Sequence, residues 1–232
     1  RPALAPTDSL MLDGYGWPTK KIGLIHSMFR PSDDACQYPF LIPSNLFAVS
    51  VLRKIAQVHR EARGDAAAAT EAEARASEVA AALRAHALIP DGQGGQVWAY
   101  EIDGFGNTLF MDDANVPSLS GLPIIDVVDK RDPLFRRTAA LAWSDRNPYY
   151  FKGSAAEGIG GRHVGLDMIW PMSIITRALN ADDDATIRQC LHWLKATHGG
   201  TGFMHESFHK DDPSKFTRPW FAWANALFGQ LI

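Results

Sequence analysis

Acidic side chains beside aromatic residues are the groups in this sequence best suited to acid–base chemistry. They lie in segments rich in Gly, Pro and Asp, and they are Asp33, Asp34, Glu101, Asp103, Asp112, Asp113 and Glu206. Hydrolysis of a glycosidic bond needs two carboxyl groups that flank the bond, one protonated and one ionised. Aromatic faces such as those of Trp98, Tyr100 and Trp220 can cover the apolar face of a sugar. The pattern therefore indicates a carbohydrate site, with the capping of helices and turns as the alternative.

Asp33 and Asp34 differ from the other loop acids in the residues on their C-terminal side. Pro39 and Pro43 come soon after the pair, and the residue before a proline avoids helical backbone angles. No helix is expected to begin directly behind the two acids, so they are poor candidates for a helix cap.

The segment His205–His209 has the sequence HESFH and matches the H-E-x-x-H pattern of zinc hydrolases. In those enzymes the two His lie one helical turn apart and bind the metal, while the Glu activates water. Here glycines at 199–202 precede the match and Pro213 comes after it, which leaves room for a helix of only about two turns. We therefore expect no metal and no cofactor, and a zinc peptidase is the less favoured alternative.

Composition excludes several other classes of function. The 232 residues carry a net charge of −3, so no basic surface predicts binding to nucleic acid or to anionic lipid. No apolar run reaches about 18 residues, so no membrane span is expected. The chain begins Arg1-Pro2-Ala3 without an initiator Met, which predicts a fragment or a processed form. Localisation cannot be read from the sequence.

The elements that must position these acids are mostly helical. Apolar residues at helical spacing predict six helices, and aromatic and β-branched residues around Asp-Gly and Gly-Asn pairs predict a small hairpin at 97–110. The helices are expected at 46–63, 66–88, 133–144, 166–179, 184–197 and 219–231. Long loops join them, and loops of this length usually carry function. We expect the loops at 29–35, 111–118, 158–165 and 199–209 to converge at one end of an all-α array.

Five stretches together resemble glycoside hydrolase family 125, a family of exo-acting α-mannosidases best known for cleaving α-1,6-linked mannose. They are FRPSDDACQYPFLIPSNLFA (29–48), DGFGN (103–107), MDDANVPSL (111–119), MIWPMSII (168–175) and GTGFMHESF…DDP…FTRPWFAWANALFG (200–229). The resemblance runs from about Gly14 to Ile232, and its motifs are long and occur in a consistent order.

The resemblance implies an inverting mechanism without a catalytic metal. The catalytic acid maps to Asp33 or Asp34, with Asp33 slightly favoured, and the catalytic base maps to Glu206. Residues expected to line the sugar pocket are Arg30, Asp112, Asp113, Asn115 and His163. The stretch GIGGRHVG around His163 departs from the expected Ser-Pro pair before the His. The substrate implied is a mannose-containing oligosaccharide or N-glycan.

The fold implied by the family is an (α/α)6 barrel, a closed ring of six helical hairpins. The family's domain is about twice as long as this chain, and the six helices expected here would form about half of the ring. Residues 1–232 are therefore predicted to be a single partial catalytic domain, its C-terminal part. The missing N-terminal half is then an expected partner, and a non-catalytic carbohydrate-binding fragment is the alternative to an active enzyme.

Overall fold

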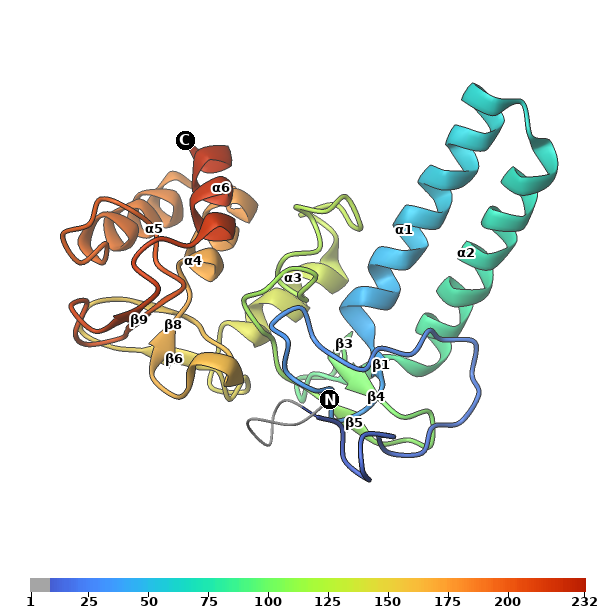
Figure 1. Cartoon of the computed structure of the whole chain (residues 1–232), viewed down its shortest axis with the longest axis horizontal. Coiled ribbons are helices and arrows are strands. Elements are labelled where there is room, and N and C mark those ends of the chain that lie inside the picture. The colour runs from blue at the N-terminus through green and yellow to red at the C-terminus, as the bar shows by residue number, and fades with distance from the viewer. Residues whose placement is uncertain (1–8) are drawn as a thin grey trace.

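The computed structural model describes residues 9–232, so residues 1–8 of the predicted domain lie outside it. Figure 1 shows a helical hairpin at one end of the molecule, further helices with small sheets at the other end, and the segment around α3 between them. The α-helices are α1 (Ile42–Val58), α2 (Ala66–His86), α3 (Pro133–Ala142), α4 (Pro171–Asn180), α5 (Asp184–Ala196) and α6 (Ala222–Leu231). A π-helical turn, η1 (His59–Arg63), continues α1, and a 3₁₀ turn, η2 (Arg162–Val164), precedes α4.

All six predicted helices are confirmed, although several begin at other residues than expected. Helix α1 begins at Ile42, with Pro43 in its first turn, where the missing N–H of proline costs nothing. Ser44, a residue type that favours helix caps, lies inside this helix. Helix α4 begins at Pro171 for the same reason.

The all-α prediction needs a correction, because ten strands also form within residues 9–232. They are β1 (Phe40–Leu41), β2 (Leu88–Pro90), β3 (Gln96–Trp98), β4 (Glu101–Ile102), β5 (Thr108–Leu109), β6 (Tyr150–Lys152), β7 (Glu157–Ile159), β8 (Met168–Ile169), β9 (Ser207–His209) and β10 (Phe216–Thr217). The sheets have the orders β1-β4-β5, β10-β9-β8, β2-β3 and β6-β7. Strands of two or three residues are too short to show an alternating pattern in the sequence. Within residues 9–232 the helices do not close a barrel.

The hairpin α1–α2 is held by small apolar residues. Ala69, Ala72, Ala76 and Val79 are buried along α2, at the spacing of one helix face. The Asp65 side chain caps α2 by accepting from the Ala68 N–H at 3.0 Å, which satisfies one of the unpaired amides of the first turn.

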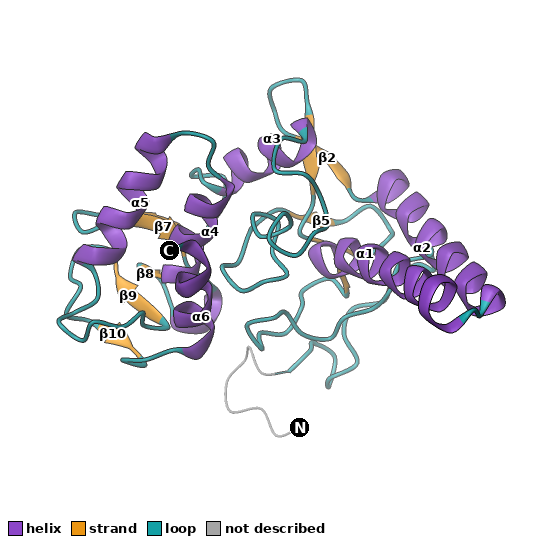
Figure 2. Cartoon of the chain, turned by 90° about the horizontal axis from the view of Figure 1, so that it is seen from above, coloured by secondary structure: helices purple, strands orange, loops and turns teal. Residues whose placement is uncertain are grey.

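The C-terminal helices enclose a second core. Helix α4 is buried over most of its length and packs on α5 and α6 around Trp170, Ile174 and Leu194. Figure 2 shows these three helices gathered beside strands β7 to β10. Asp183 caps α5 by accepting from Thr186 N–H, a role to which Asp is well suited.

Two sheet registers bring the candidate loops onto the cores. The predicted hairpin forms between β4 and β5, with Glu101 opposite Leu109, and β4 pairs on its other side with β1, where Leu41 lies opposite Glu101. In the sheet β10-β9-β8, Ile169 lies opposite Phe208. The acidic segment that ends at β1 therefore lies against Glu101, and the HESFH segment lies against the start of α4.

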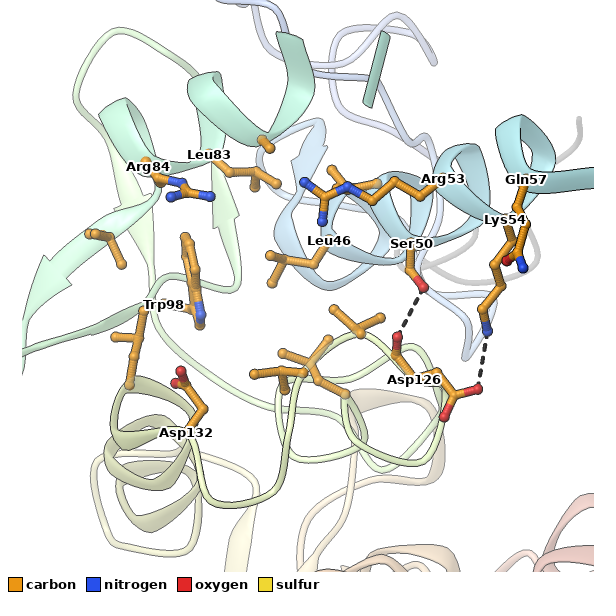
Figure 3. Close-up of a pocket in the computed structure, with 17 residues that line it drawn as sticks. Leu46, Ser50, Arg53, Lys54, Gln57, Leu83, Arg84, Trp98, Asp126 and Asp132 are labelled. Carbon is orange, nitrogen blue, oxygen red and sulfur yellow. Dashed lines mark hydrogen bonds and ion pairs between the residues drawn. The ribbon is translucent and has the colours of Figure 1, made fainter. Parts of the chain in front are cut away.

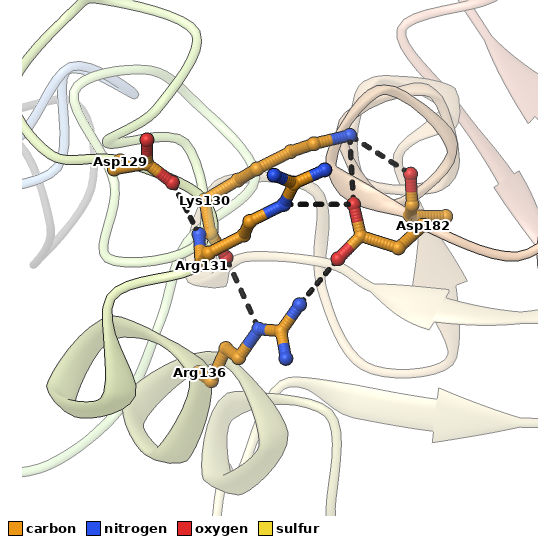
Figure 4. Close-up of polar contacts among 6 residues, drawn as sticks. Asp129, Lys130, Arg131, Arg136 and Asp182 are labelled. Carbon is orange, nitrogen blue, oxygen red and sulfur yellow. Dashed lines mark hydrogen bonds and ion pairs between the residues drawn. The ribbon is translucent and has the colours of Figure 1, made fainter.

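An ion-pair cluster joins the segment before α3 to the turn between α4 and α5. The Asp182 carboxylate pairs with Lys130 at 3.2 Å, with Arg131 at 3.9 Å and with Arg136, and Lys130 also donates to the Ala181 carbonyl (Figure 4). These side chains are at least one-third exposed. The cluster therefore contributes little to the free energy of unfolding and mainly fixes how the two segments lie against each other.

None of the helices within residues 9–232 has the length and apolar character that a membrane crossing requires. Cys36 and Cys190 are both buried and unpaired.

Candidate active site

The segment that contains Asp33 and Asp34 is a tight turn that separates the two carboxyl groups. Arg30 N–H donates to the Asp34 carbonyl at 2.8 Å, and Asp33 N–H donates to the Arg30 carbonyl at 3.0 Å. Asp33 sits in the left-handed region with φ 68°, a conformation that Asp tolerates better than most residues. The Asp33 side chain is exposed, whereas Asp34 is 1% exposed.

The Asp34 carboxyl group is surrounded by charged groups from other loops. His163 Nδ1 lies 3.7 Å from Asp34 Oδ1, and Ser32 Oγ donates to Oδ2 at 3.4 Å. Within the described residues Oδ1 has no hydrogen-bond partner. Burial and the nearby charge of Asp113 raise the pKa of Asp34, against the opposing effects of His163, Arg30 and Ser32. Desolvation disfavours the ionised form, so the site favours the protonated form of this carboxyl group.

Asp113 and Asn115 add two further unpartnered oxygens. Asp113 Oδ1 accepts from the Asn115 amide N–H at 3.0 Å and from its side-chain Nδ2 at 2.9 Å. In the described part of the chain, Asp113 Oδ2 and Asn115 Oδ1 have no partner, although both are buried. A Cβ at Gly161 would lie 3.2 Å from Asp113 Oδ2, so glycine keeps the space beside this oxygen open. Such oxygens are suited to accept hydroxyl protons from a ligand.

Asp112 has a different environment from its neighbour. Its Oδ1 accepts from Leu119 N–H at 2.8 Å, and its Oδ2 accepts from the Ser120 N–H and hydroxyl at 2.9 and 2.6 Å. Burial raises the pKa of Asp112 to about 7, although these hydrogen bonds act in the opposite direction. With both oxygens engaged by its own loop, Asp112 supports the turn that presents Asp113.

Three residues near Asp34 are absent from the catalytic and pocket residues that the family resemblance implies, although Glu101 and Tyr100 were among the candidate acidic and aromatic residues. Glu101 is fully buried and pairs with Arg30 Nε at 2.6 Å. Tyr100 is fully buried, with the Arg30 guanidinium 5.5 Å from its ring centre. Burial raises the pKa of Tyr149, and the charges of Asp34 and Asp113 raise it further. The aromatic and acidic types at 100 and 101 were a signal in the sequence, but nothing there linked them to Arg30.

Glu206 lies in the second group of candidate residues. It is 5% exposed, and its Oε1 lies 3.4 Å from Arg218 Nε, whose side chain faces solvent. Its backbone N–H donates to the Thr217 carbonyl at 3.3 Å. The carboxylate is therefore held at the edge of the β9–β10 pair beside a positive charge.

The HESFH segment is extended and not helical. Ser207–His209 is strand β9, so residues 205 and 209 do not lie one helical turn apart on a helix face. His205 donates from Nδ1 to the Pro219 carbonyl at 3.0 Å and stacks on Phe216 with ring centres 3.9 Å apart. The helical geometry that a zinc peptidase needs does not form. Residues 9–232 contain no group of three or more His, Cys, Asp or Glu arranged to hold a metal ion.

A common support links the candidate loops. Ala114, Val164 and Met204 belong to one hydrophobic core, built around Ile169 and Trp170. These three residues lie in the loops at 111–118, 158–165 and 199–209, and the loop of Asp34 joins them through His163. Within residues 9–232, Glu206 pairs with Arg218 and makes no ion pair with the Asp34 loop.

A wide groove in the described part of the chain lies away from these loops. It has a volume of about 660 Å³ between α1, α2 and the segment before α3, and Trp98, Leu46 and Leu83 form much of its apolar wall (Figure 3). At one end Ser50 and Lys54 contact Asp126. None of the predicted site residues lines this groove.

Comparison with known proteins gives a consistent result. The family model for metal-independent α-mannosidases, glycoside hydrolase family 125, matches residues 1–232. The meiotically up-regulated gene 157 protein of Schizosaccharomyces pombe is 45% identical over 228 residues, which are 97% of this chain and 45% of that protein. A solved Streptococcus pneumoniae structure, described as a metal-independent α-mannosidase in a non-productive complex with α-1,6-mannobiose, is 37% identical with a TM-score of 0.92. It matches 100% of this chain, which covers 55% of the solved chain. This chain thus spans about half the length of both relatives.

Proposed function

Because the chain belongs to glycoside hydrolase family 125, the metal-independent α-mannosidases, we propose that it provides the acid and the base of an exo-acting α-mannosidase. The enzyme removes a terminal α-1,6-linked mannose with inversion at C1. The single observation that carries this proposal is the buried Asp34 carboxyl, enclosed by Asp113, His163 and Arg30 and with its pKa raised.

Asp34 is the better candidate for the general acid than Asp33. A general acid must hold its proton near neutral pH, and burial beside another carboxylate favours this state. Asp33 is exposed on the outside of the turn and lacks this burial. Asp34 then donates its proton to the glycosidic oxygen as the bond between this oxygen and C1 of the terminal mannose breaks.

Glu206 is the proposed general base. Its carboxylate lies 3.4 Å from Nε of Arg218, so a positive charge stands beside the oxygen that would accept the proton. It removes a proton from the water that attacks C1 on the face opposite the leaving group. Each of the two proton transfers contributes about 10²–10⁴-fold to the rate.

The sugar is bound by the polar groups around Asp34. Arg30, Asp113, Asn115 and His163 are proposed to contact mannose hydroxyls, because Asp113 Oδ2 and Asn115 Oδ1 are buried without a partner in residues 9–232. Asp112 acts indirectly, because its hydrogen bonds to Leu119 and Ser120 fix the loop that carries Asp113 and Asn115. The substrate class, a mannose oligosaccharide that includes N-glycans, is supported by the α-1,6-mannobiose bound to the pneumococcal relative.

The helices are proposed to belong to an (α/α)6 barrel. The likeness to the pneumococcal structure over all of this chain, but only 55% of that one, supports a catalytic domain of which these residues are part. A complementary set of helices would then complete the sugar pocket.

Incubation with α-1,6-mannobiose, with and without a chelator, tests the proposal. It is run on this chain and on the natural full-length protein, and free mannose is measured. Release that is equal with and without chelator is the expected result. Mannobiose binding without turnover in the full-length protein would indicate a carbohydrate-binding protein, and chelator-sensitive peptidase activity would indicate the zinc alternative.

A further inference from the structure

The loop that carries Asp34 is fastened at both ends by one buried carboxylate. Glu101 on β4 is fully buried. Its Oε1 accepts from Arg30 Nε at 2.6 Å, and its Oε2 accepts from the backbone N–H groups of Gln37 and Tyr38 at 2.9 and 3.1 Å. Arg30 begins the turn, and Gln37 and Tyr38 lie where the loop returns to β1. All three donors thus converge on one side chain.

The contact with Glu101 also keeps the Arg30 guanidinium charged. Burial by itself would lower the pKa of Arg30, but its hydrogen bond and ion pair with Glu101 outweigh this effect. The guanidinium is therefore a permanent positive charge close to Asp34, where it favours the ionised carboxylate. The carboxylate of Glu101 opposes this charge directly, with its Oε1 2.6 Å from Arg30 Nε.

The other groups that act on Asp34 come from its own turn and from three further segments. Asp113 in the 111–118 loop favours the protonated form, while His163 on η2 and the Ser32 hydroxyl favour the ionised form. Tyr149, just before β6, lies near enough for the charge of Asp34 to affect its phenol. The charge of Asp113 also acts on Arg30, but Glu101 is the carboxylate that pairs with the guanidinium directly.

We propose that Glu101 is a positioning residue of the reaction: it fixes both ends of the Asp34 loop and neutralises the Arg30 guanidinium. This inference rests on the proposed function, in which Asp34 is the general acid. Glu101 does not touch the substrate, so its loss should act through Asp34.

The test is made in the natural full-length protein with two substitutions that separate charge from geometry. Glu101→Gln keeps the size of the side chain and leaves the charge of Arg30 uncompensated, which should lower the pKa of Asp34. Its amide N–H₂ must also face either Arg30 Nε or the N–H groups of Gln37 and Tyr38, which donated to the carboxylate. We expect kcat on α-1,6-mannobiose at neutral pH to fall about 10–100-fold, KM to change less than about 3-fold, and the alkaline side of the pH–rate profile to move about one unit lower. Glu101→Asp keeps the charge and should lower kcat with little movement of that profile.

A control comes from an acid that is only partly buried. Glu157 on β7 pairs with Arg177 at 3.5 Å and accepts from the Tyr150 hydroxyl. Glu157→Gln removes a comparable Arg–carboxylate contact outside the Asp34 loop, and it should retain the kcat and pH–rate profile of the parent.

A second readout keeps the inference separate from the proposed function. Selective ¹³C labelling of Asp carboxyl carbons, assigned with Asp34→Asn, monitors the titration of Asp34 directly by NMR. Its midpoint should move lower in Glu101→Gln and return toward the parent value in the double variant Arg30→Gln/Glu101→Gln, which removes both charges and also remains informative if the single variant fails to fold.

The outcomes are distinct. A parent protein without mannosidase activity refutes the proposed function, while the NMR titration still decides the role of Glu101. A folded Glu101→Gln protein with unchanged kcat and an unchanged Asp34 midpoint overturns the inference. Lower thermal stability with the same kcat per folded molecule would also overturn it, since Glu101 would then serve folding alone.

Discussion

The imidazole of His163 faces the buried carboxyl group of Asp34, with Nδ1 3.7 Å from Oδ1. The two residues come from loops about 130 positions apart in the chain, and their contact joins the acid loop to the core beneath Glu206. The sequence around His163 departs from the expected motif, yet the side chain occupies a position from which it acts directly on Asp34.

The two neighbouring acids should behave differently on substitution. Asp34→Asn should lower kcat on α-1,6-mannobiose about 10²–10⁴-fold, because the amide cannot donate a proton to the leaving oxygen. Asp33→Asn, at an exposed position, should stay within a few fold of the parent.

Leaving-group dependence checks that assignment. An aryl α-mannoside with a strongly acidic phenol departs without protonation, so Asp34→Asn should lose much less activity on it than on mannobiose. Equal losses on both substrates, or an inactive Asp33→Asn with an active Asp34→Asn, would reverse the roles of the pair.

Glu206→Gln should abolish turnover on both kinds of substrate while mannobiose still binds. The amide keeps the shape of the carboxylate but cannot accept the proton of the attacking water. Calorimetry measures the binding, and His209→Ala is a suitable control because His209 lies on β9 outside the proposed site. Full activity of Glu206→Gln would remove this residue from the mechanism.

The pH dependence should change in a defined direction when His163 is replaced. The reaction needs Asp34 protonated, so activity falls as pH rises through the pKa of Asp34, which burial and Asp113 raise. His163 opposes that shift, so His163→Gln should move the alkaline side of the pH–rate profile to higher pH. Movement to lower pH, measured on kcat, would contradict the contact's proposed effect.

Asp112 and Asp113 should separate stability from substrate binding. Asp112→Asn places an amide N–H₂ against donors from Leu119 and Ser120, and it should lower the free energy of unfolding by about 2 kcal/mol. Asp113→Asn replaces only the unpartnered oxygen, so its stability should change by less than about 1 kcal/mol while KM rises about 10-fold. Urea unfolding and steady-state kinetics measure the two effects, and the opposite pattern would exchange the two roles.

The sequence predicted the helices well because each one carries an apolar face at helical spacing. The cap of α5 by Asp183 is seen in the structure alone. Apart from the hairpin of β4 and β5, the strands escaped prediction because they are two or three residues long and form only when separate loops meet. Their pairing depends on tertiary contacts that no local pattern contains.

Within the site, residue types were predictable but their division of labour was not. Asp33 and Asp34 are identical in type, and only the left-handed turn at Asp33 determines which one is buried. Glu101 was visible as a loop acid, but its partner Arg30 lies 71 residues away. The H-E-x-x-H pattern misleads when read alone, since the backbone there is a strand.

Proton NMR during the first minutes of α-1,6-mannobiose hydrolysis by the natural full-length protein tests the central claim most directly. The anomeric proton of the newly released terminal mannose identifies its configuration before mutarotation. An inverting α-mannosidase with Asp34 as acid and Glu206 as base should release β-mannose first, with or without a chelator. First release of α-mannose would contradict the account, because it requires a retaining mechanism in which one carboxylate attacks the sugar.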